Sequence, residues 1–156
     1  MMKGKIIVMT SNEAELDLAT SCGTIVGNRD GKILLAHVTG TRYWDIPKGV
    51  QEYDESPFDA AKRELYEETG LVFDDELFQE VGDFDYLTDK RLHLFLVRAP
   101  ESLLSLSHLA CTSYFSHKVT GLPTAEMDDF RWASRSDVVR LCTPEMASRL
   151  LSLSWK

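Results

Sequence analysis

The stretch from Gly49 to Leu71, GVQEYDESPFDAAKRELYEETGL, decides the fold because it holds the clearest helix signal in the chain. Ser56 is a suitable N-cap, Pro57 has the fixed backbone angle of a first helical residue, and Asp59 places an acid in the first turn. Gly70 stands where a helix ends with a left-handed residue. We therefore predict one helix between these caps, with a loop on each side.

The two sides of this helix differ in character. Its apolar stripe should face the core and comprises Phe58, Ala61, Leu65 and Thr69. Glu64, Glu67 and Glu68 lie off that stripe and are neighbours on the helix surface, because they are spaced by three and four residues. Like charges so placed destabilise a helix, whereas clustered oxygen ligands suit hard cations such as Mg²⁺. Taken alone, the pattern also describes a solvated acidic face in which Arg63 pairs with Glu67.

The wider spacing resembles that of the Nudix hydrolase family. That family's signature is G-x5-E-x7-R-E-U-x-E-E-x-G-U, where U is a bulky aliphatic residue. Every fixed position is matched, by Gly49, Glu55, Arg63, Glu64, Leu65, Glu67, Glu68, Gly70 and Leu71. The resemblance implies a hydrolase of acid anhydrides, a pyrophosphohydrolase that cuts a phosphoanhydride bond in a nucleoside diphosphate linked to a further group, with Mg²⁺ or Mn²⁺ as cofactor.

Roles for individual residues follow from the same resemblance. It implies that the metal is held by Glu64, Glu67 and Glu68, with Glu64 preferred as the base that accepts a proton from water. The main-chain carbonyl of Lys48 often completes such a site. Arg63 and Glu55 are expected to orient the carboxylates, a role that matters nearly as much as ligation.

A further acid is expected from a segment distant in sequence. Glu126 precedes Trp132 by six residues, which is similar to an acid-then-Trp segment in many family members. We expect Glu126 to be a fourth metal ligand or the general base. Asp128 and Asp129 compete for this role, and a plain surface acid is the alternative.

The segment 44–49, WDIPKG, bears on the substrate. It is similar to the lead-in of the branch that cleaves dinucleoside polyphosphates such as diadenosine tetraphosphate. It is also similar to that of RNA 5′-pyrophosphohydrolases, and enzymes that act on nucleoside triphosphates are a further alternative. Lys48 would add a cation for the distal phosphates, with Arg42 and Lys90 in support.

Aromatic residues offer faces on which a base can stack. The candidates are Tyr43, Phe84 and Tyr86. Phe84 and Tyr86 alternate with Asp85, so on a strand they share one face. That face is equally suited to the core, and packing is the preferred interpretation of Trp44 and Pro47.

Composition limits the class of protein. A length of 156 residues, 44% hydrophobic and 27% charged, is typical of one globular domain, which we place at 1–156. A net charge of −8 argues against stable binding to a nucleic-acid backbone, so the expected partner is a small nucleotide. Three widely spaced cysteines favour reduced thiols in the cytoplasm, and no membrane span is expected. A homodimer is left open. The four histidines lack zinc-ligand spacing.

The remaining chain predicts strands before and after the helix and a helical C-terminal end. We expect strands at 5–9, 22–27, 32–38, 78–87, 91–97, 113–119 and 130–133, and helices at 137–141 and 144–153. Segment 100–109 fits a short helix or an ordered loop. The fold class is therefore α+β or a layered α/β/α sandwich, with a mixed β-sheet flanked by helices and a loop–helix–loop motif as in the Nudix fold. The competing classes are a nucleotide-sensing module without catalysis and an interaction domain with an acidic helix.

Overall fold

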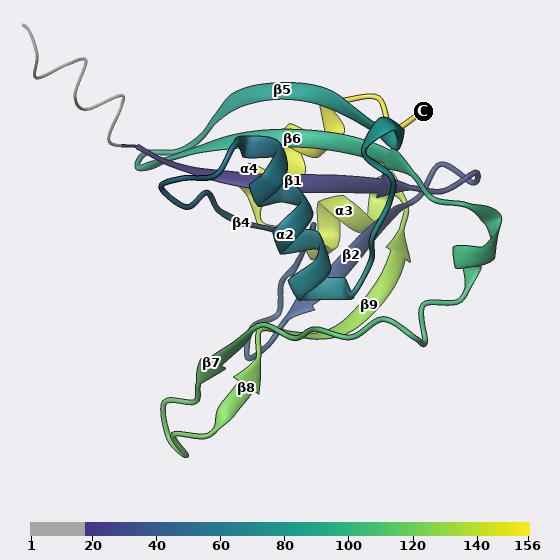
Figure 1. Ribbon diagram of the computed structural model, residues 1–156. Helices are drawn as coiled ribbons and strands as arrows, with labels where there is room; N and C mark the ends of the chain where they lie inside the picture. Colours follow the sequence, from purple (N-terminus) through teal and green to yellow (C-terminus); the bar gives the residue numbers. More distant parts are fainter. Residues whose placement is uncertain (1–17) are drawn as a thin grey trace, which may run out of the picture.

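The computed structural model describes residues 18–156, so the strand predicted at 5–9 lies outside the described residues. Figure 1 shows the elements in chain order. They are β1 (Ala19–Gly27), β2 (Ile33–Val38), β3 (Trp44–Asp45), β4 (Lys48–Val50), α2 (Pro57–Thr69), η1 (Asp75–Leu77), β5 (Phe78–Leu87), β6 (Lys90–Arg98), η2 (Glu101–Leu104), β7 (Tyr114–Ser116), β8 (Pro123–Ala125), β9 (Met127–Ala133), α3 (Arg135–Leu141) and α4 (Pro144–Leu151).

One mixed sheet organises the described chain. Within residues 18–156 it has seven strands, in the order β3-β2-β1-β6-β5, with β4 also paired to β1 and β9 to β2. β1 and β6 run parallel, and the other strand pairs are antiparallel. β1 and β2, predicted as strands, form a hairpin, in whose turn Asn28 Oδ1 accepts hydrogen bonds from the N–H groups of Asp30 and Lys32. β7 and β8 form a separate two-stranded hairpin.

Helices cover both faces of the sheet. On one face, Val26 and Leu34 pack with Leu65 of α2. On the other face, the neighbouring residues Ile25 and Leu35 pack in a cluster that includes residues of α3 and α4. Consecutive strand residues point to opposite faces, so β1 and β2 are buried on both sides. The predicted layered sandwich is confirmed, and Figure 1 shows α2 on the opposite side of the sheet from α3 and α4.

The structure differs from the sequence prediction at segment 44–49. The expected strands do not include this segment, which forms the short strands β3 and β4. β4 pairs with β1, and the Thr24 N–H donates to the carbonyl of Pro47 at 3.1 Å. The long partner strand β1 therefore imposes extended structure that a local pattern of six residues does not reveal.

Smaller corrections concern the C-terminal half. The strand expected at 113–119 is only β7, paired with the unpredicted β8 around a turn. Segment 100–109 holds the short helix η2 followed by irregular chain. α3 begins at Arg135 because Ser134 caps it and forms a capping box with Asp137, and α4 ends at Leu151. These ends depend on hydrogen bonds of single side chains.

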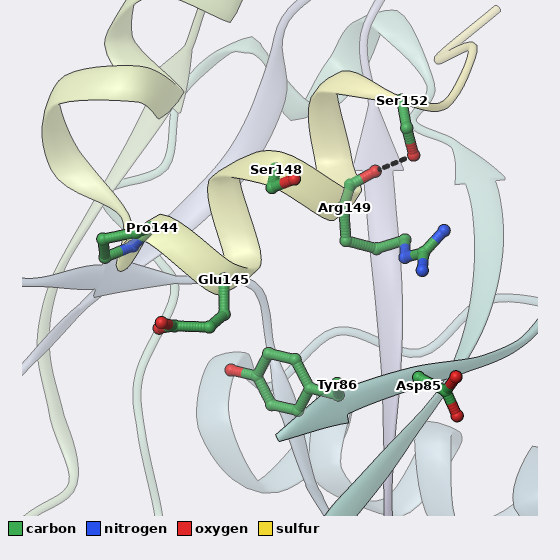
Figure 2. Close-up of a pocket in the computed structure, with 7 residues that line it drawn as sticks. All are labelled: Asp85, Tyr86, Pro144, Glu145, Ser148, Arg149 and Ser152. Carbon is green, nitrogen blue, oxygen red and sulfur yellow. Dashed lines mark hydrogen bonds between the residues drawn. The ribbon is translucent and has the colours of Figure 1, made fainter. Parts of the chain in front are cut away.

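An open pocket of about 470 Å³ lies between the end of β5 and α4. Figure 2 shows the residues that line it, which are Asp85, Tyr86, Pro144, Glu145, Ser148, Arg149 and Ser152. No helix in the described range 18–156 has the length and apolarity needed to cross a membrane. The three cysteines are free and buried, as expected for reduced thiols.

Candidate functional site

The caps of α2 form as predicted and fix the position of the acidic helix. Ser56 Oγ accepts a hydrogen bond from the Asp59 N–H at 3.0 Å, and Pro57 is the first helical residue. Gly70 adopts a left-handed conformation, φ 81°, and its N–H donates to the carbonyl of Tyr66 at 2.8 Å. The helix therefore starts and stops at defined residues beside β4.

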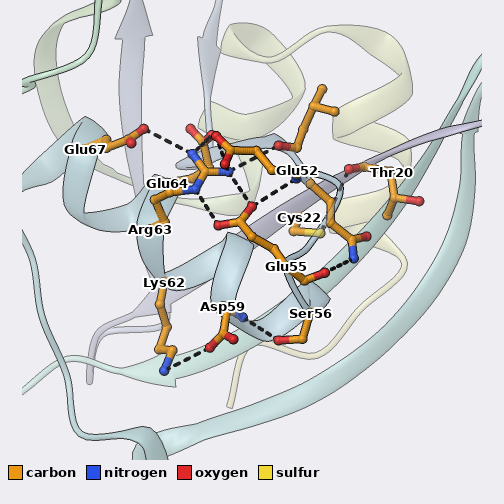
Figure 3. A network of polar contacts seen from close by, with 12 residues as sticks. Thr20, Cys22, Glu52, Glu55, Ser56, Asp59, Lys62, Arg63, Glu64 and Glu67 are labelled. Carbon is orange, nitrogen blue, oxygen red and sulfur yellow. Dashed lines mark hydrogen bonds and ion pairs between the residues drawn. The ribbon is translucent and has the colours of Figure 1, made fainter.

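Arg63 links the carboxylates of the site. Its Nε and Nη2 donate to the two oxygens of Glu55 at 2.6 and 2.8 Å, a two-point ion pair. Its Nη1 donates to Glu64 at 2.8 Å and to Glu67 at 3.3 Å (Figure 3). The Arg63–Glu67 pair suggested by the helix spacing is present, and the guanidinium also contacts Glu64 at the shorter distance. Arg63 also holds the pKa of Glu55 down at about 2, chiefly through this hydrogen bond.

Replacing Arg63 by lysine should test its positioning role. Lysine keeps the positive charge but loses the planar fork that reaches Glu55 and Glu64 together. We expect kcat to fall by about 10- to 100-fold, the usual loss when a partner of metal ligands is removed. Steady-state kinetics with matched circular dichroism spectra would measure this, and Lys62→Arg on the preceding helical position is the control. An Arg63→Lys enzyme with unchanged kcat would contradict the role.

Glu64 lies against the backbone of β4. Glu64 is only 9% exposed. The sequence pattern placed this residue off the core-facing stripe of the helix and did not predict its burial. A Cβ atom added to Gly49 would lie 2.1 Å from the carboxyl carbon of Glu64, so glycine is required there for close approach. Burial raises the pKa of the Glu64 carboxyl, while the Arg63 hydrogen bond opposes this rise.

Glu68 is the most enclosed of the three helix glutamates. It is 2% exposed, and its Oε1 accepts a hydrogen bond from the Lys48 N–H at 3.1 Å. Burial raises the pKa of this carboxyl to about 9. The backbone of Lys48 therefore reaches the acidic helix, as predicted, although ligation by the Lys48 carbonyl stays a prediction.

The raised pKa of Glu68 predicts how the folding stability of the protein depends on pH when a chelator keeps it free of metal ions. The folded chain binds the Glu68 proton more tightly than the unfolded chain, whose carboxyl has the ordinary pKa near 4.5. The contribution of Glu68 to folding stability is therefore full below about pH 4.5 and is lost progressively as pH rises toward 9. Urea unfolding at several pH values would measure this. Glu68→Gln should remove most of the slope, and an equal slope in that variant would contradict the prediction.

The side chain of Lys48 is not a free cation for phosphates. Its Nζ lies 3.1 Å from Asp45 Oδ2 and 5.9 Å from the ring centroid of Tyr86. Asp45 raises the pKa of the ammonium against the opposing effect of burial. Sequence reasoning missed Asp45, although its spacing of three residues from Lys48 was a signal for this pair. The pair places the ammonium beside the ring of Tyr86, a residue that lines the pocket.

The aromatic candidates have separate positions. Tyr86 lines the pocket, and Phe84 packs against the core with the guanidinium of Arg149 4.2 Å from its ring centroid. Phe84 is thus part of the packing beneath α4, the alternative already considered. Tyr43 lies in the loop between β2 and β3, where Arg42 stacks on its ring at 4.8 Å. The predicted substrate residues therefore do not form one cluster.

Glu126 lies beside the acidic helix, between β8 and β9. Ser113, which the sequence did not suggest, donates from its Oγ to Glu126 Oε1 at 2.8 Å. The charge of Glu126 also acts on Glu64. Its two competitors have other partners: Asp128 contacts His37 at 2.5 Å, and Asp129 accepts from the Phe130 N–H. The geometry therefore favours Glu126 over both.

The donor set suits a divalent cation. Glu64, Glu67, Glu68 and Glu126 supply four carboxylates, whereas Arg63 supplies a single charge that it shares with Glu55. Carboxylate oxygens are the ligands that Mg²⁺ and Mn²⁺ prefer. In the described part of the chain, no three of these side chains yet surround one point. Arg63 draws the Glu64 and Glu67 carboxylates to itself, so they would turn from it to bind a cation.

Clustered carboxylates on a loop–helix–loop beside a mixed sheet suit a hydrolase that acts on phosphoanhydrides with a divalent metal ion. Residues 17–152 match the model of the NUDIX domain, and the chain belongs to this family. It is a pyrophosphohydrolase, an enzyme that cuts pyrophosphate bonds. The expected family resemblance, fold class and enzyme class are confirmed.

Known relatives agree with this membership. An uncharacterized 17.7 kDa protein of Enterobacteria phage T4 is 37% identical over 125 residues, covering 74% of this chain and 82% of its own. The RNA pyrophosphohydrolase of Tolumonas auensis is 33% identical over 128 residues, covering 72% and 68%. Two solved structures, both 18% identical, share the fold. The MutT NUDIX hydrolase of Burkholderia pseudomallei has a TM-score of 0.61 and coverage of 87% and 98%, and the C. elegans Ap4A hydrolase has 0.56, 85% and 95%.

Proposed function

We propose that the chain is a Mg²⁺-dependent hydrolase of dinucleoside polyphosphates, with Mn²⁺ as an alternative ion. The observation that carries the metal site is the set of glutamates on α2, which Arg63 and the Lys48 N–H hold at one end of the sheet. Glu64, Glu67 and Glu68 would hold the ion, joined by Glu126. When bound, the ion neutralises the phosphate oxygens and lowers the pKa of water.

The residues of the chain then have distinct tasks. Glu64 accepts a proton from the attacking water, while Arg63 keeps its carboxylate oriented. The water oxygen bonds to phosphorus from the side opposite the leaving group. The bridging P–O bond breaks, and its electron pair leaves with the departing phosphate. No covalent intermediate with the protein is needed, so the buried cysteines have no part in the reaction.

The substrate proposal rests on the open pocket between β5 and α4. Tyr86 offers an aromatic face in this pocket, which suits the base of a nucleoside. The 44–49 segment supports the same substrate through its resemblance to dinucleoside polyphosphate hydrolases. The net charge of −8 disfavours long contact with a nucleic-acid backbone. We also propose a cytoplasmic location, because the three buried thiols are free.

A second candidate is removal of pyrophosphate from RNA 5′ ends. It is favoured by the 33% identity to the Tolumonas auensis RNA pyrophosphohydrolase. Diadenosine tetraphosphate, dGTP and a 5′-triphosphorylated RNA oligonucleotide should be compared with Mg²⁺ at equal concentration. We expect the highest kcat/KM for the dinucleotide. A higher value for the RNA would replace the first candidate by the second, and no turnover of any of the three would overturn both.

Replacing Glu126 by glutamine tests its place among the ligands. The amide keeps the volume and can still accept from Ser113, but it loses the charge that a divalent ion needs. We expect a 10- to 100-fold lower kcat and a higher Mg²⁺ requirement, on the order of losses seen near metal sites. Asp128→Asn, which removes the His37 partner instead, is the matched control. Unchanged turnover and Mg²⁺ dependence in Glu126→Gln would exclude the role.

A further inference from the structure

The β7–β8 hairpin exposes apolar side chains close to the acidic site. Figure 1 shows it projecting from the body of the protein beyond α2. Tyr114 is 58% exposed and Phe115 39%, and the turn adds Val119 and Leu122. Apolar side chains grouped in this way on a folded domain commonly mark a binding surface.

The register of the hairpin separates its two aromatic residues. Tyr114 pairs with Ala125 and Phe115 with Thr124. One step closer to the body, Ser113 faces Glu126, and their side chains are hydrogen-bonded to each other. Side chains alternate along a strand, so Phe115 shares the face of the Glu126 carboxylate, about 7 Å further out. Tyr114 lies on the opposite face.

The face that carries Phe115 continues the acidic site. The base of the hairpin is attached to the end of α2, because the Thr112 N–H donates to the Glu67 carbonyl at 2.6 Å. The charge of Glu126 acts on Glu64 across the intervening space. A polyphosphate held by the α2 glutamates therefore has Phe115 next along the hairpin, outward from Glu126.

We propose that Phe115 is a stacking platform for a nucleoside base of the substrate. This inference rests on the proposed function and adds to it a second base site, separate from the pocket beside Tyr86. A phenyl ring accepts any base through its face, without a demand on base identity. A base bound there would belong to a nucleoside whose phosphate chain extends from the α2 glutamates outward along the hairpin.

Three variants test the platform on the full chain. Phe115→Leu removes the aromatic face and should raise the KM for diadenosine tetraphosphate about tenfold, with kcat nearly unchanged. Phe115→Trp should restore the KM. Tyr114→Leu removes an equal aromatic group from the opposite face and should leave KM unchanged. Quenching of the added tryptophan by diadenosine tetraphosphate, but not by inorganic tripolyphosphate, would report the base directly.

The outcomes that overturn the platform are distinct from failure of the proposed function. An unchanged KM in Phe115→Leu overturns it, and so does an equal rise in both leucine variants. A change of sedimentation coefficient in Phe115→Leu would instead assign the face to contact between copies of the chain. If the wild type hydrolyses no dinucleotide, the proposed function fails. The quenching experiment on Phe115→Trp tests the stacking platform without any need for hydrolysis. Quenching by diadenosine tetraphosphate but not by tripolyphosphate would support the platform, and no such difference would contradict it.

Discussion

Glu68→Gln is expected to lower kcat/KM by about 1000-fold, which corresponds to about 4 kcal/mol of transition-state stabilisation. Glu68 is 2% exposed beside the Lys48 backbone, so within residues 18–156 another carboxylate would need a rearrangement of β4 and α2 to take its place. Glutamine has the same shape and keeps an oxygen that accepts from the Lys48 N–H. It lacks the negative charge that a divalent ion requires. Steady-state kinetics over a range of Mg²⁺ concentrations would measure the loss.

The same substitution should stabilise the protein in a chelator. Without a cation, the buried Glu68 carboxyl must take up a proton when the chain folds at neutral pH, and a neutral amide avoids that cost. A loss of activity together with a gain in stability would indicate that Glu68 binds the ion, because a general folding defect would lower both. Glu76→Gln, on an exposed acid of η1, is the control and should alter neither. Turnover within tenfold of the wild type in Glu68→Gln would rule out the proposed role of this carboxylate.

Local signals in the sequence predicted α2 because its determinants are contiguous. Ser56, Pro57 and Gly70 act on backbone groups within one or two turns, and each does so in the structure. The strands β3 and β4 were missed for the opposite reason. Their extended form depends on pairing with β2 and β1, which lie elsewhere in the chain. The β8 strand likewise depends on its partner β7.

In the candidate site, too, features set by nearby residues were predicted and features set by distant parts of the chain were not. The spacing of the glutamates and Arg63 predicted which residues meet, because α2 itself brings them together. The burial of Glu64 and Glu68 was not predicted, since it arises from β4 lying across the helix. The Lys48–Asp45 pair and the Ser113–Glu126 hydrogen bond required the fold. Lys48 was expected to add a cation for the distal phosphates, and the pairing of its ammonium with Asp45, three residues away, was not considered in that expectation.

Gly49→Ala is expected to disable the site through Glu64. The new methyl group would lie 2.1 to 2.4 Å from the three carboxyl atoms of Glu64, far inside contact distance. Either the carboxylate leaves the site or β4 moves away from β1. We expect kcat to fall by about 100- to 1000-fold, as for loss of a preorganised catalytic group. We also expect a loss of about 2 kcal/mol in stability, as is usual for overpacking.

A double-mutant cycle distinguishes this clash from a general disturbance of β4. If the destabilisation comes from the clash between the new methyl group and the Glu64 carboxylate, removing that carboxylate should abolish it. Gly49→Ala should therefore destabilise the wild type by about 2 kcal/mol but the Glu64→Ala background by less than about 0.5 kcal/mol. Equal destabilisation in both backgrounds would show that the glycine serves β4 alone. Val50→Ala, at an exposed neighbouring position, controls for the strand and should have little effect in either background. A coupling of this size would show that Gly49 serves the catalytic site, because the Glu64 carboxylate occupies the space that a side chain at position 49 would fill.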